Sequence, residues 1–407
     1  MIARKNNNSI YDLRNALIYF KKMHYDSVIL IWVIKIVFFY ITARIGNFLI
    51  SDKKSDKKIK IAFDSIHFTG NPRAVYEKIN EKYSDKYECY WIAKRKETIK
   101  QIKKRKGKVV YSYSVFGLSK FLKTKIWIRS HPGMGVFSFL PTNEYKLIQL
   151  WHGIGPKGIN HPPEEYNMHD IWCVSSKYAK KRHIELWDAP KEKLFVTGFA
   201  EMDLLYKYIK MKKEKLLDEL AIEKRKKIIL YAPTYDIGLW PWDDQYKEFE
   251  ELCKYCQEKN LQLILRLHPY AKVNRNKIKK IVNSFNNIYW LDMVNEPDTM
   301  KLLAVSDILL TDWSSIYTDF LLTKRPIIHL ETNTIFFTKE RGKPEVPPSF
   351  RAGEITSNKK EFYQTLNLVL EKGNRYKKEQ EKLLNIIHGR VDGNSSERII
   401  KIIEGVL

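Results

Sequence analysis

From about residue 57 the sequence alternates short apolar runs typical of β-strands with segments of helical periodicity. Such alternation favours a parallel sheet, because a crossover helix usually connects each parallel strand to the next. The apolar runs are continuous, which is typical of strands covered on both faces. In the first half of the chain we expect strands at 58–63, 87–93, 108–113, 125–130, 146–151, 170–176 and 193–199.

A second alternating set follows a charged helical stretch at 202–227. Its expected strands are 227–233, 261–269, 287–292, 307–312 and 326–330, with two or three helices from about residue 358. At 407 residues the chain is long enough for two cores. We therefore predict an α/β protein with two Rossmann-like domains, residues 57–205 and 206–407, that face a cleft. Ligands of such folds bind at the carboxyl ends of the strands.

The first 56 residues form a separate basic and apolar segment. Residues 27–50 approach the length of a bilayer span, but Lys35 and Arg44 interrupt them. These charges and the flanking lysines favour a helix that lies in the membrane interface. A single spanning helix and a buried core helix remain open alternatives. We expect a peripheral protein on the cytoplasmic face of the cell membrane.

The chain carries a formal net charge of +25, which favours polyanionic partners such as an anionic membrane surface or a phosphate-rich polymer. A general lysine bias and solubility are the alternative explanation for much of this charge. The four cysteines are too few for a disulfide framework in a chain of this size. Cys253 and Cys256 form a CxxC within a helical pattern, and no second ligand pair accompanies it, so we expect no metal site there.

Unusual polar residues follow the strand that ends near Trp151. His152 comes first, and the loop Gly153, Ile154, Gly155, Pro156 and Lys157 continues from it. Glycines let backbone N–H groups approach an anion, and Lys157 adds positive charge. The spacing matches neither a Walker loop nor a dinucleotide-binding GxGxxG. We expect an anion-binding loop.

Three strand ends of the second half carry similar residues. Arg266 and His268 flank Leu267 two positions apart, so strand alternation predicts that both project from one face. A guanidinium can clamp a phosphate, and an imidazole can transfer a proton. Asp312, Ser314 and Ser315 open a helix, either as a phosphate seat or as a simple helix cap. Pro233 and Thr234 end another strand. Together these groups predict a cation-rich, metal-free site for phosphate transfer, with no cofactor.

The ordered set of motifs resembles the CDP-glycerol glycerophosphotransferase family of teichoic acid primases and polymerases. The resemblance covers roughly residues 58–400 and rests on FTGNPRAVYEKI (68–79), LWHGIGPKGI (150–159), VTGFAEMD (196–203), ILYAPTYD (229–236), LRLHP (265–269) and LLTDWSSIYTDF (309–320). It implies a GT-B-like architecture and peripheral association with a membrane. It also implies a CDP-glycerol or similar CDP-polyol donor and a lipid-linked or capsular, anionic acceptor.

The resemblance assigns roles to individual residues. His152 and Lys157 match the family's His-Gly-Thr-Pro-x-Lys segment, and Arg266 and His268 match its Arg-x-His-Pro segment. Pro233 and Thr234 match its Ala-Pro-Thr-Trp segment. Ser314, Ser315 and Asp319 match the donor-binding Asp-Tyr-Ser-Ser…Asp segment. By this similarity an acceptor hydroxyl attacks the β-phosphorus of the donor and CMP leaves. We expect His152 to act as the general base and His268 as the donor to phosphoryl oxygens, although the two roles could be exchanged.

The sequence departs from the family pattern at three places. Ile154 and Gly155 replace Thr-Pro, and Tyr235 replaces a tryptophan. Glu201 stands where the family's Gly-x-Pro-Arg-x-Asp segment has an arginine that contacts donor phosphate. A carboxylate in place of a guanidinium leaves open a different polyol donor, such as CDP-ribitol, or a different phosphate geometry.

Two other functions fit part of the sequence. A GT-B glycosyltransferase that uses a nucleotide sugar would need a carboxylate late in the second half to hold ribose or sugar hydroxyls, and Glu331 is the candidate. A basic protein that binds membrane or nucleic acid would explain the charge and the apolar segment. It would give no reason for histidines at strand ends in both halves, and we expect no nucleic-acid partner.

Overall fold

The computed structural model describes residues 58–131 and 145–407, except 66, 113, 160, 162 and 225, together with four single positions between 38 and 45. The segment 27–50, which we expect to associate with a membrane, therefore lies almost entirely outside the described residues. Within the part of the chain that is described, no helix combines the length and the apolar character needed to cross a bilayer.

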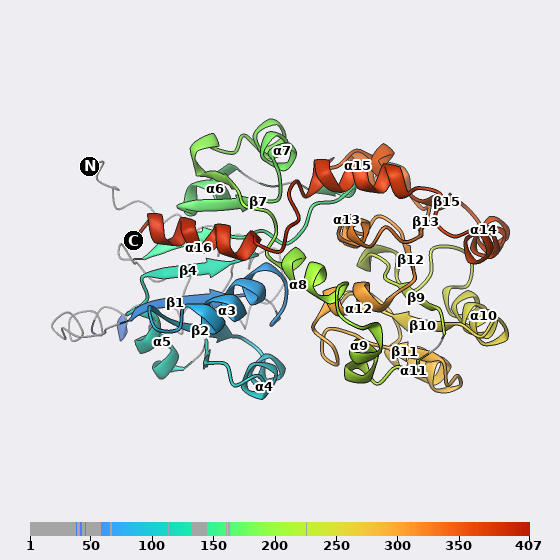
Figure 1. The fold of residues 1–407 in the computed structure, drawn as a ribbon, viewed down its shortest axis with the longest axis horizontal. Helices are drawn as coiled ribbons and strands as arrows, with labels where there is room; N and C mark the ends of the chain where they lie inside the picture. The colour runs from blue at the N-terminus through green and yellow to red at the C-terminus, as the bar shows by residue number, and fades with distance from the viewer. Residues whose placement is uncertain are drawn as a thin grey trace.

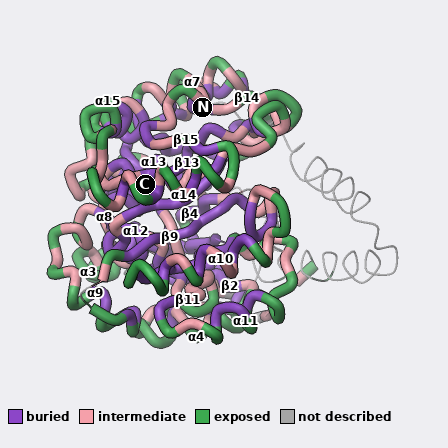
Figure 2. The backbone as a smooth tube through the Cα atoms, turned by 90° about the vertical axis from the view of Figure 1, so that its right-hand side faces the viewer, coloured by how far each residue is buried: buried purple, intermediate pink, exposed green. Residues whose placement is uncertain are grey.

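The first half forms one seven-stranded parallel sheet in the order β3-β2-β1-β4-β5-β7-β8. Each expected strand is confirmed, and Figure 2 shows mostly buried backbone in the interior of the molecule and exposed backbone around it. The strands are β1 Ile59–Asp64, β2 Tyr87–Ala93, β3 Val109–Tyr111, β4 Ile126–Arg129, β5 Lys146–Gln149, β7 Ile171–Val174 and β8 Leu194–Val196. The helices are α3 Gly70–Lys82, α4 Lys96–Lys104, α5 Val115–Phe121, α6 Pro163–Met168 and α7 Lys177–Trp187.

The second half forms a six-stranded parallel sheet in the order β11-β10-β9-β12-β13-β15. Five strands were expected; β15 was not, because its three residues give no recognisable pattern. The strands are β9 Ile228–Tyr231, β10 Gln262–Leu265, β11 Ile288–Trp290, β12 Ile308–Thr311, β13 Ile327–Leu330 and β15 Glu354–Thr356. The helices are α10 Gln245–Glu258, α11 Arg275–Asn283, α12 Thr299–Val305, α13 Ile316–Phe320, α14 Lys359–Lys372 and α15 Lys377–Ile387. Cys253 and Cys256 lie on α10, buried in the apolar core of this half.

Shorter elements complete the chain. The charged stretch between the two sets of strands forms α8 Glu201–Tyr208 and α9 Lys213–Leu220. One π-helical turn, η5 Phe336–Glu340, precedes β14 Lys343–Pro344. The 3₁₀ turns are η2 Lys191–Lys193, η3 Tyr235–Ile237, η4 Leu321–Thr323 and η6 Pro348–Phe350.

Two further elements join the halves. Strand β6 Gly158–Ile159 of the first half pairs antiparallel with β14 of the second. Helix α16 Ser395–Gly405 returns from the second half to the first, where Ile399, Ile400 and Ile403 enter the apolar core against α3 (Figure 1). The expected segment 206–407 thus includes a helix that packs on the first sheet.

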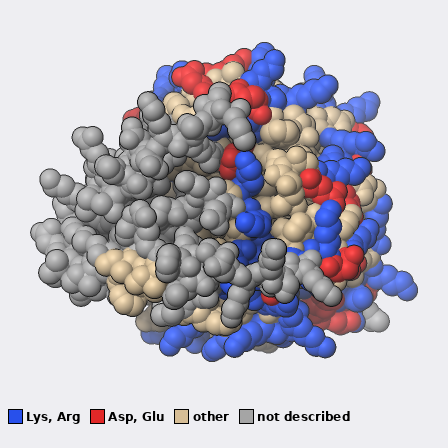
Figure 3. All heavy atoms as spheres, turned by 90° about the vertical axis from the view of Figure 1, so that its left-hand side faces the viewer, with Lys and Arg blue, Asp and Glu red and all other residues tan. Residues whose placement is uncertain are grey.

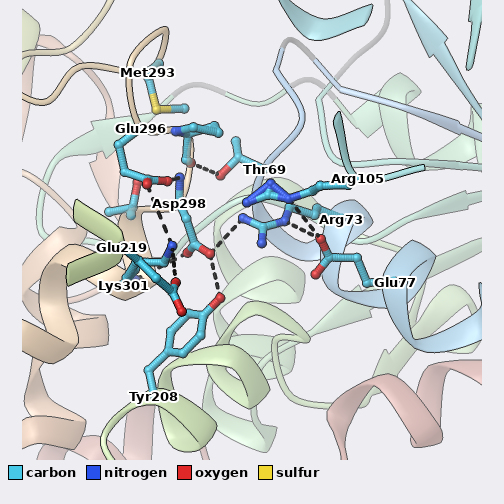
Figure 4. Close-up of polar contacts among 12 residues, drawn as sticks. Thr69, Arg73, Glu77, Arg105, Tyr208, Glu219, Met293, Glu296, Asp298 and Lys301 are labelled. Carbon is cyan, nitrogen blue, oxygen red and sulfur yellow. Dashed lines mark hydrogen bonds and ion pairs between the residues drawn. The ribbon is translucent and has the colours of Figure 1, made fainter. Parts of the chain in front are cut away.

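A buried ion pair also connects the halves (Figure 4). Arg73 Nη1 on α3 lies 2.8 Å from Asp298 Oδ2 at the start of α12, and the two side chains are only 4% and 2% exposed. Tyr208 on α8 donates its hydroxyl to the same carboxylate oxygen at 2.7 Å. Burial alone would raise the pKa of Asp298, but the Arg73 guanidinium holds the pKa below its ordinary value. The Asp298 carboxylate therefore stays ionised in the interior because Arg73 pairs with it.

Replacing Arg73 with methionine should destabilise the fold. The change leaves Asp298 as a buried charge without its guanidinium, and breaking such a pair costs about 3–5 kcal/mol. We expect the free energy of unfolding, measured by urea denaturation, to fall by about 3 kcal/mol. Lys86→Met, which removes an exposed pair with Glu404, is the control and should change it little. An R73M variant as stable as the wild type would show that the pair contributes nothing.

Candidate active site

The strand-end loops of the two sheets come together at one place. The loop after β5 carries Lys157, whose Nζ lies 3.1 Å from Thr234 Oγ1 at the end of β9. From the second half, Thr318 donates its hydroxyl to the carbonyl of Ile154 at 3.0 Å, and the Val346 N–H donates to the carbonyl of Gly155 at 3.1 Å. The structure thus brings together candidate residues that the sequence separates by more than 70 positions.

The loop from 152 to 158 lies directly against the second half. A Cβ on Gly155 would come within 2.9 Å of Ser315 Cβ, and Gly153 has a φ of +147°, so both positions favour glycine. Ile154 and Pro156 are buried and therefore pack the loop instead of facing a ligand. At the place of the family's Thr-Pro, Ile154 thus makes an apolar contact and Gly155 lets the backbone approach Ser315 closely.

His152 has an unprotonated nitrogen available. Its Nδ1 lies 2.9 Å from the carbonyl oxygen of Ser130, and a carbonyl can only accept, so Nδ1 carries the proton. The ring stacks on His131 with centroids 4.2 Å apart. One edge stays open to solvent, but the surrounding protein removes enough hydration to lower the pKa of His152 to about 4. At neutral pH Nε2 therefore holds a lone pair.

His268 has the opposite tautomer. The backbone N–H of Tyr270 donates to His268 Nδ1 at 3.1 Å, so the neutral ring carries its proton on Nε2. Burial, followed by the positive charge of Lys157, lowers the pKa of His268 to about 4. One histidine can thus accept a proton at Nε2, and the other can donate a hydrogen bond from Nε2.

A group of cations lies beside His268. The ring of Tyr235 lies 5.0 Å from the His268 ring and 5.0 Å from Lys157 Nζ. Arg341 Nη1 lies 2.6 Å from Asp236 Oδ1, and Lys157 Nζ lies 3.8 Å from the other oxygen of the same carboxylate. Burial and then the charge of Arg341 lower the pKa of Lys157. This cluster places two cations around one carboxylate at the point where the halves meet.

Asp312 organises the neighbouring turn. Both of its carboxylate oxygens accept from the backbone N–H of Thr234, at 2.9 and 3.1 Å, and Oδ1 also accepts from the Ser314 N–H. Burial raises the pKa of Asp312 to about 7, although these N–H groups and Lys157 oppose the rise. Asp312 therefore fixes Thr234 in the segment that follows β9 and shapes the turn that carries Ser314 and Ser315.

Arg266 does not project beside His268. Its guanidinium donates to the carbonyls of Leu291 and Glu296 and to the hydroxyl of Thr299, and it is buried. Strand β10 ends at Leu265, so the alternation that predicts a shared face does not extend to these residues. The prediction of a phosphate clamp is corrected: Arg266 holds the loop after β11, and Leu267 is core.

Asp319 interacts with His388 and with Glu201. Its Oδ1 is 3.5 Å from His388 Nε2, and its charge raises the pKa of buried Glu201, after the larger effect of burial. Burial likewise raises the pKa of Asp319 to about 7. A Cβ on Gly70 would lie 3.6 Å from Glu201 Oε2, which places this carboxylate at the start of α3. The carboxylate of Glu201 therefore cannot supply the positive charge that the arginine of the family pattern would bring to this position.

Several residues of the site were not predicted from the sequence. His131 belongs to one of three His-Pro pairs, and the sequence alone does not distinguish a functional pair from a structural one. Arg341 and Asp236 lie 105 positions apart, Asp236 in the short turn η3 and Arg341 directly after η5. Glu331, the candidate of the glycosyltransferase alternative, pairs with Arg351 Nη1 at 2.7 Å. Among the residues that the structure describes, no group of three or more His, Cys, Asp or Glu side chains is placed to hold a metal ion.

Comparison with protein families and curated proteins gives a consistent result. Residues 47–405 match the model of the CDP-Glycerol:Poly(glycerophosphate) glycerophosphotransferase family. The teichoic acid ribitol-phosphate polymerase TarK of Staphylococcus aureus is 25% identical over 375 residues, which is 86% of this chain and 68% of TarK. A teichoic acid poly(glycerol phosphate) polymerase of Bacillus spizizenii is 27% identical over 79% of this chain and 90% of its own length. The chain spans only half of the related ribitol-phosphate polymerase TarL of Staphylococcus aureus.

Solved structures agree on the fold. The wall teichoic acid polymerase TagF superposes with a TM-score of 0.70 at 18% identity, over 98% of both chains. A UDP-GlcNAc 2-epimerase from Neisseria meningitidis superposes with a TM-score of 0.56 at 14% identity, over 86% of this chain and 100% of the epimerase. At these identities the likeness concerns the α/β architecture with its parallel sheets.

Proposed function

Because the chain belongs to the CDP-glycerol:poly(glycerophosphate) glycerophosphotransferase family, we propose that it transfers a glycerol-phosphate or related polyol-phosphate unit from a CDP-activated donor to a hydroxyl of a teichoic acid-type acceptor. CMP is the second product. The observation that carries this proposal is the pair of neutral histidines with opposite tautomers, one from each half, beside a cation cluster.

The tautomers favour one assignment of roles. His152 Nε2 accepts the proton of the acceptor hydroxyl as its oxygen forms a bond to the β-phosphorus of the donor. The bond from that phosphorus to the CMP phosphate oxygen breaks, and CMP leaves with the electron pair. His268 Nε2–H donates to the phosphoryl oxygens, and Lys157 offsets their negative charge. The exchanged assignment would need both rings to break their contacts with backbone groups.

The donor is CDP-glycerol or CDP-ribitol. Curated relatives include both glycerol-phosphate and ribitol-phosphate enzymes, at similar identity. TagF, which shares the fold, has been studied with CDPG. The acceptor is a lipid-linked, anionic polymer or its primer, which suits the excess of positive charge on this chain.

The working enzyme is GT-B-like and peripheral to the membrane. Residues 57–205 form a Rossmann-like acceptor side, residues 206–407 form a Rossmann-like donor side, and the two face a cleft. Residues 1–56 lie on the cytoplasmic face of the cell membrane. The exposed lysines of α4 support this, since they add positive charge outside the N-terminal segment; they are Lys96, Lys100, Lys103 and Lys104. Lysine and arginine side chains also line the lower edge of the face in Figure 3.

His152→Ala should abolish most turnover while donor binding persists. Loss of a general base lowers rates by about 10²–10⁴-fold. The measurement is CMP release from CDP-glycerol and from CDP-ribitol with a defined lipid acceptor. His161→Asn is the control, because His161 packs in the aromatic cluster around Trp151 and Trp172. Near-normal CMP release by H152A would refute the assignment, and turnover of nucleotide sugars alone would favour a glycosyltransferase.

The pH profile of kcat/KM should reflect the lowered pKa of His152. A general base acts when unprotonated, so a pKa of about 4 leaves it active down to pH ~5 and inactive below pH ~4. His268 keeps its Nε2–H in both protonation states and should add no acid limb. Asp312, whose pKa burial raises to about 7, adds a titration near neutrality, so the profile is measured in Asp312→Asn as well. We expect the loss of the base to appear in both proteins as a fall between pH ~5 and pH ~4. A fall centred near pH 6.5 that persists in D312N would mean that the ring of the catalytic base is not desolvated.

Removal of residues 1–56 should weaken membrane attachment. We expect the truncated protein to lose most of its co-sedimentation with vesicles of anionic phosphatidylglycerol, because the apolar segment is gone. Residual binding should depend on salt. A full-length variant with Lys100, Lys103 and Lys104 changed to Glu is the control for α4, and it should keep apolar attachment. Unchanged binding of the truncated protein in high salt would contradict this placement.

A further inference from the structure

Arg341 lies in the cation cluster but belongs to no motif that points to a function. It follows η5 and precedes β14, the strand that pairs with β6 of the first half. Its backbone N–H donates to the carbonyl of Phe336 at 3.0 Å, which fixes the start of the side chain. The guanidinium lies over the ring of Tyr235 at 5.2 Å and donates to the Tyr235 hydroxyl. The arginine is therefore held in place before any ligand arrives.

The guanidinium still has donors to offer. Nη1 is 2.6 Å from Asp236 Oδ1, and Nη2 contacts the Tyr235 hydroxyl. Nε is buried and has no hydrogen-bond partner among the described residues. An arginine carries five N–H groups in a fork that matches two phosphate oxygens. A buried, unpaired N–H is costly, and an anion bound along this edge would satisfy it.

The charges around Asp236 do not balance. Lys157 and Arg341 share this one carboxylate, and their mutual repulsion contributes to the lowered pKa of Lys157. Asp312 lies nearby, but its burial favours the neutral form, so it supplies less than a full negative charge. A diphosphate between the two cations would relieve this repulsion.

The family pattern requires a guanidinium that this chain lacks at its usual place. Glu201 stands there; its carboxylate lies by Gly70 and near Asp319, and burial raises its pKa. Tyr235 brings Arg341 to the side of the site that holds His268, since its ring contacts both residues. An arginine from a different segment thus occupies a position suited to the missing charge.

We propose that Arg341 is a donor-binding residue whose guanidinium holds two oxygens of the donor diphosphate, and that Asp236 is the counter-ion that keeps it in place in the free enzyme. This inference rests on the proposed function and names the residue that replaces the family arginine. On binding, the diphosphate shares or replaces the contact of Arg341 with Asp236. Lys157 then neutralises the charge from the side of the first half.

The test compares Arg341→Gln and Arg341→Lys with the wild type. Titration calorimetry measures affinities for CDP-glycerol, CDP-ribitol, CMP and pyrophosphate, and CMP release gives kcat and KM. We expect R341Q to bind the preferred CDP-polyol at least ~20-fold more weakly and CMP only a few-fold more weakly, because CMP lacks the second phosphate. R341K should recover part of the loss. Asp236→Asn should bind pyrophosphate at least as tightly as the wild type, since it removes a competing anion.

Arg375→Gln is the matched control. This arginine also forms a bidentate pair with a carboxylate, Glu354, but it lies on the exposed surface away from the site. Its donor affinity should equal that of the wild type. Thermal unfolding identifies variants that do not fold, and R341K then carries the test.

The outcomes separate the two proposals. A wild-type protein that binds or turns over neither CDP-polyol overturns the proposed function. A wild type that binds CDP-polyol while R341Q binds it equally well overturns only the role of Arg341. Equal losses for CMP and for the CDP-polyol in R341Q would also overturn that role, because a merely structural arginine would affect the whole nucleotide site.

Discussion

The two halves of this protein meet backbone to backbone, and this contact sets the position of the side chains between them. Gly155 has room for no Cβ against Ser315, and Gly158 lies so close to Gly342 that a Cβ would come within 2.1 Å of its carbonyl oxygen. The β6–β14 pair holds the same loop. Lys157 extends from this loop, so its ammonium reaches the second sheet because the backbone beneath it is clamped. Larger side chains at these glycines would move the cation as well as the loop.

Backbone groups also determine the protonation chemistry. A carbonyl beside His152 and an N–H beside His268 select opposite tautomers before any substrate binds. Neither choice depends on a titratable partner, so the arrangement is insensitive to pH around neutrality. Low pKa values keep both rings uncharged next to Lys157, where two imidazolium ions would repel it. The site therefore concentrates positive charge in the groups that bind phosphate and keeps the proton-transfer group neutral.

Much of the fold was predictable, because long apolar strands and their helices follow directly from residue patterns. The strand β15 and the pair β6–β14 were not, since two or three residues carry no period and their pairing depends on distant segments. Among site residues, His152, Lys157 and His268 were found at strand ends as expected. Arg266 was misplaced because its strand ends at Leu265, three residues before His268, so the alternation does not reach either residue. Arg341 was not predicted, because its partner Asp236 is distant in sequence and the single turns that carry the two residues are too short to show a pattern.

Helix α16 has a mechanical consequence. The chain passes between the halves at α8 and again in residues 388–394 before α16 packs on the first sheet. Two covalent connections restrict the relative displacement of the halves more than one connection would. Any separation of the halves would also have to break the β6–β14 pair and the contact of the glycine loop with Ser315, so the loop and the two connections together hold the site in one register.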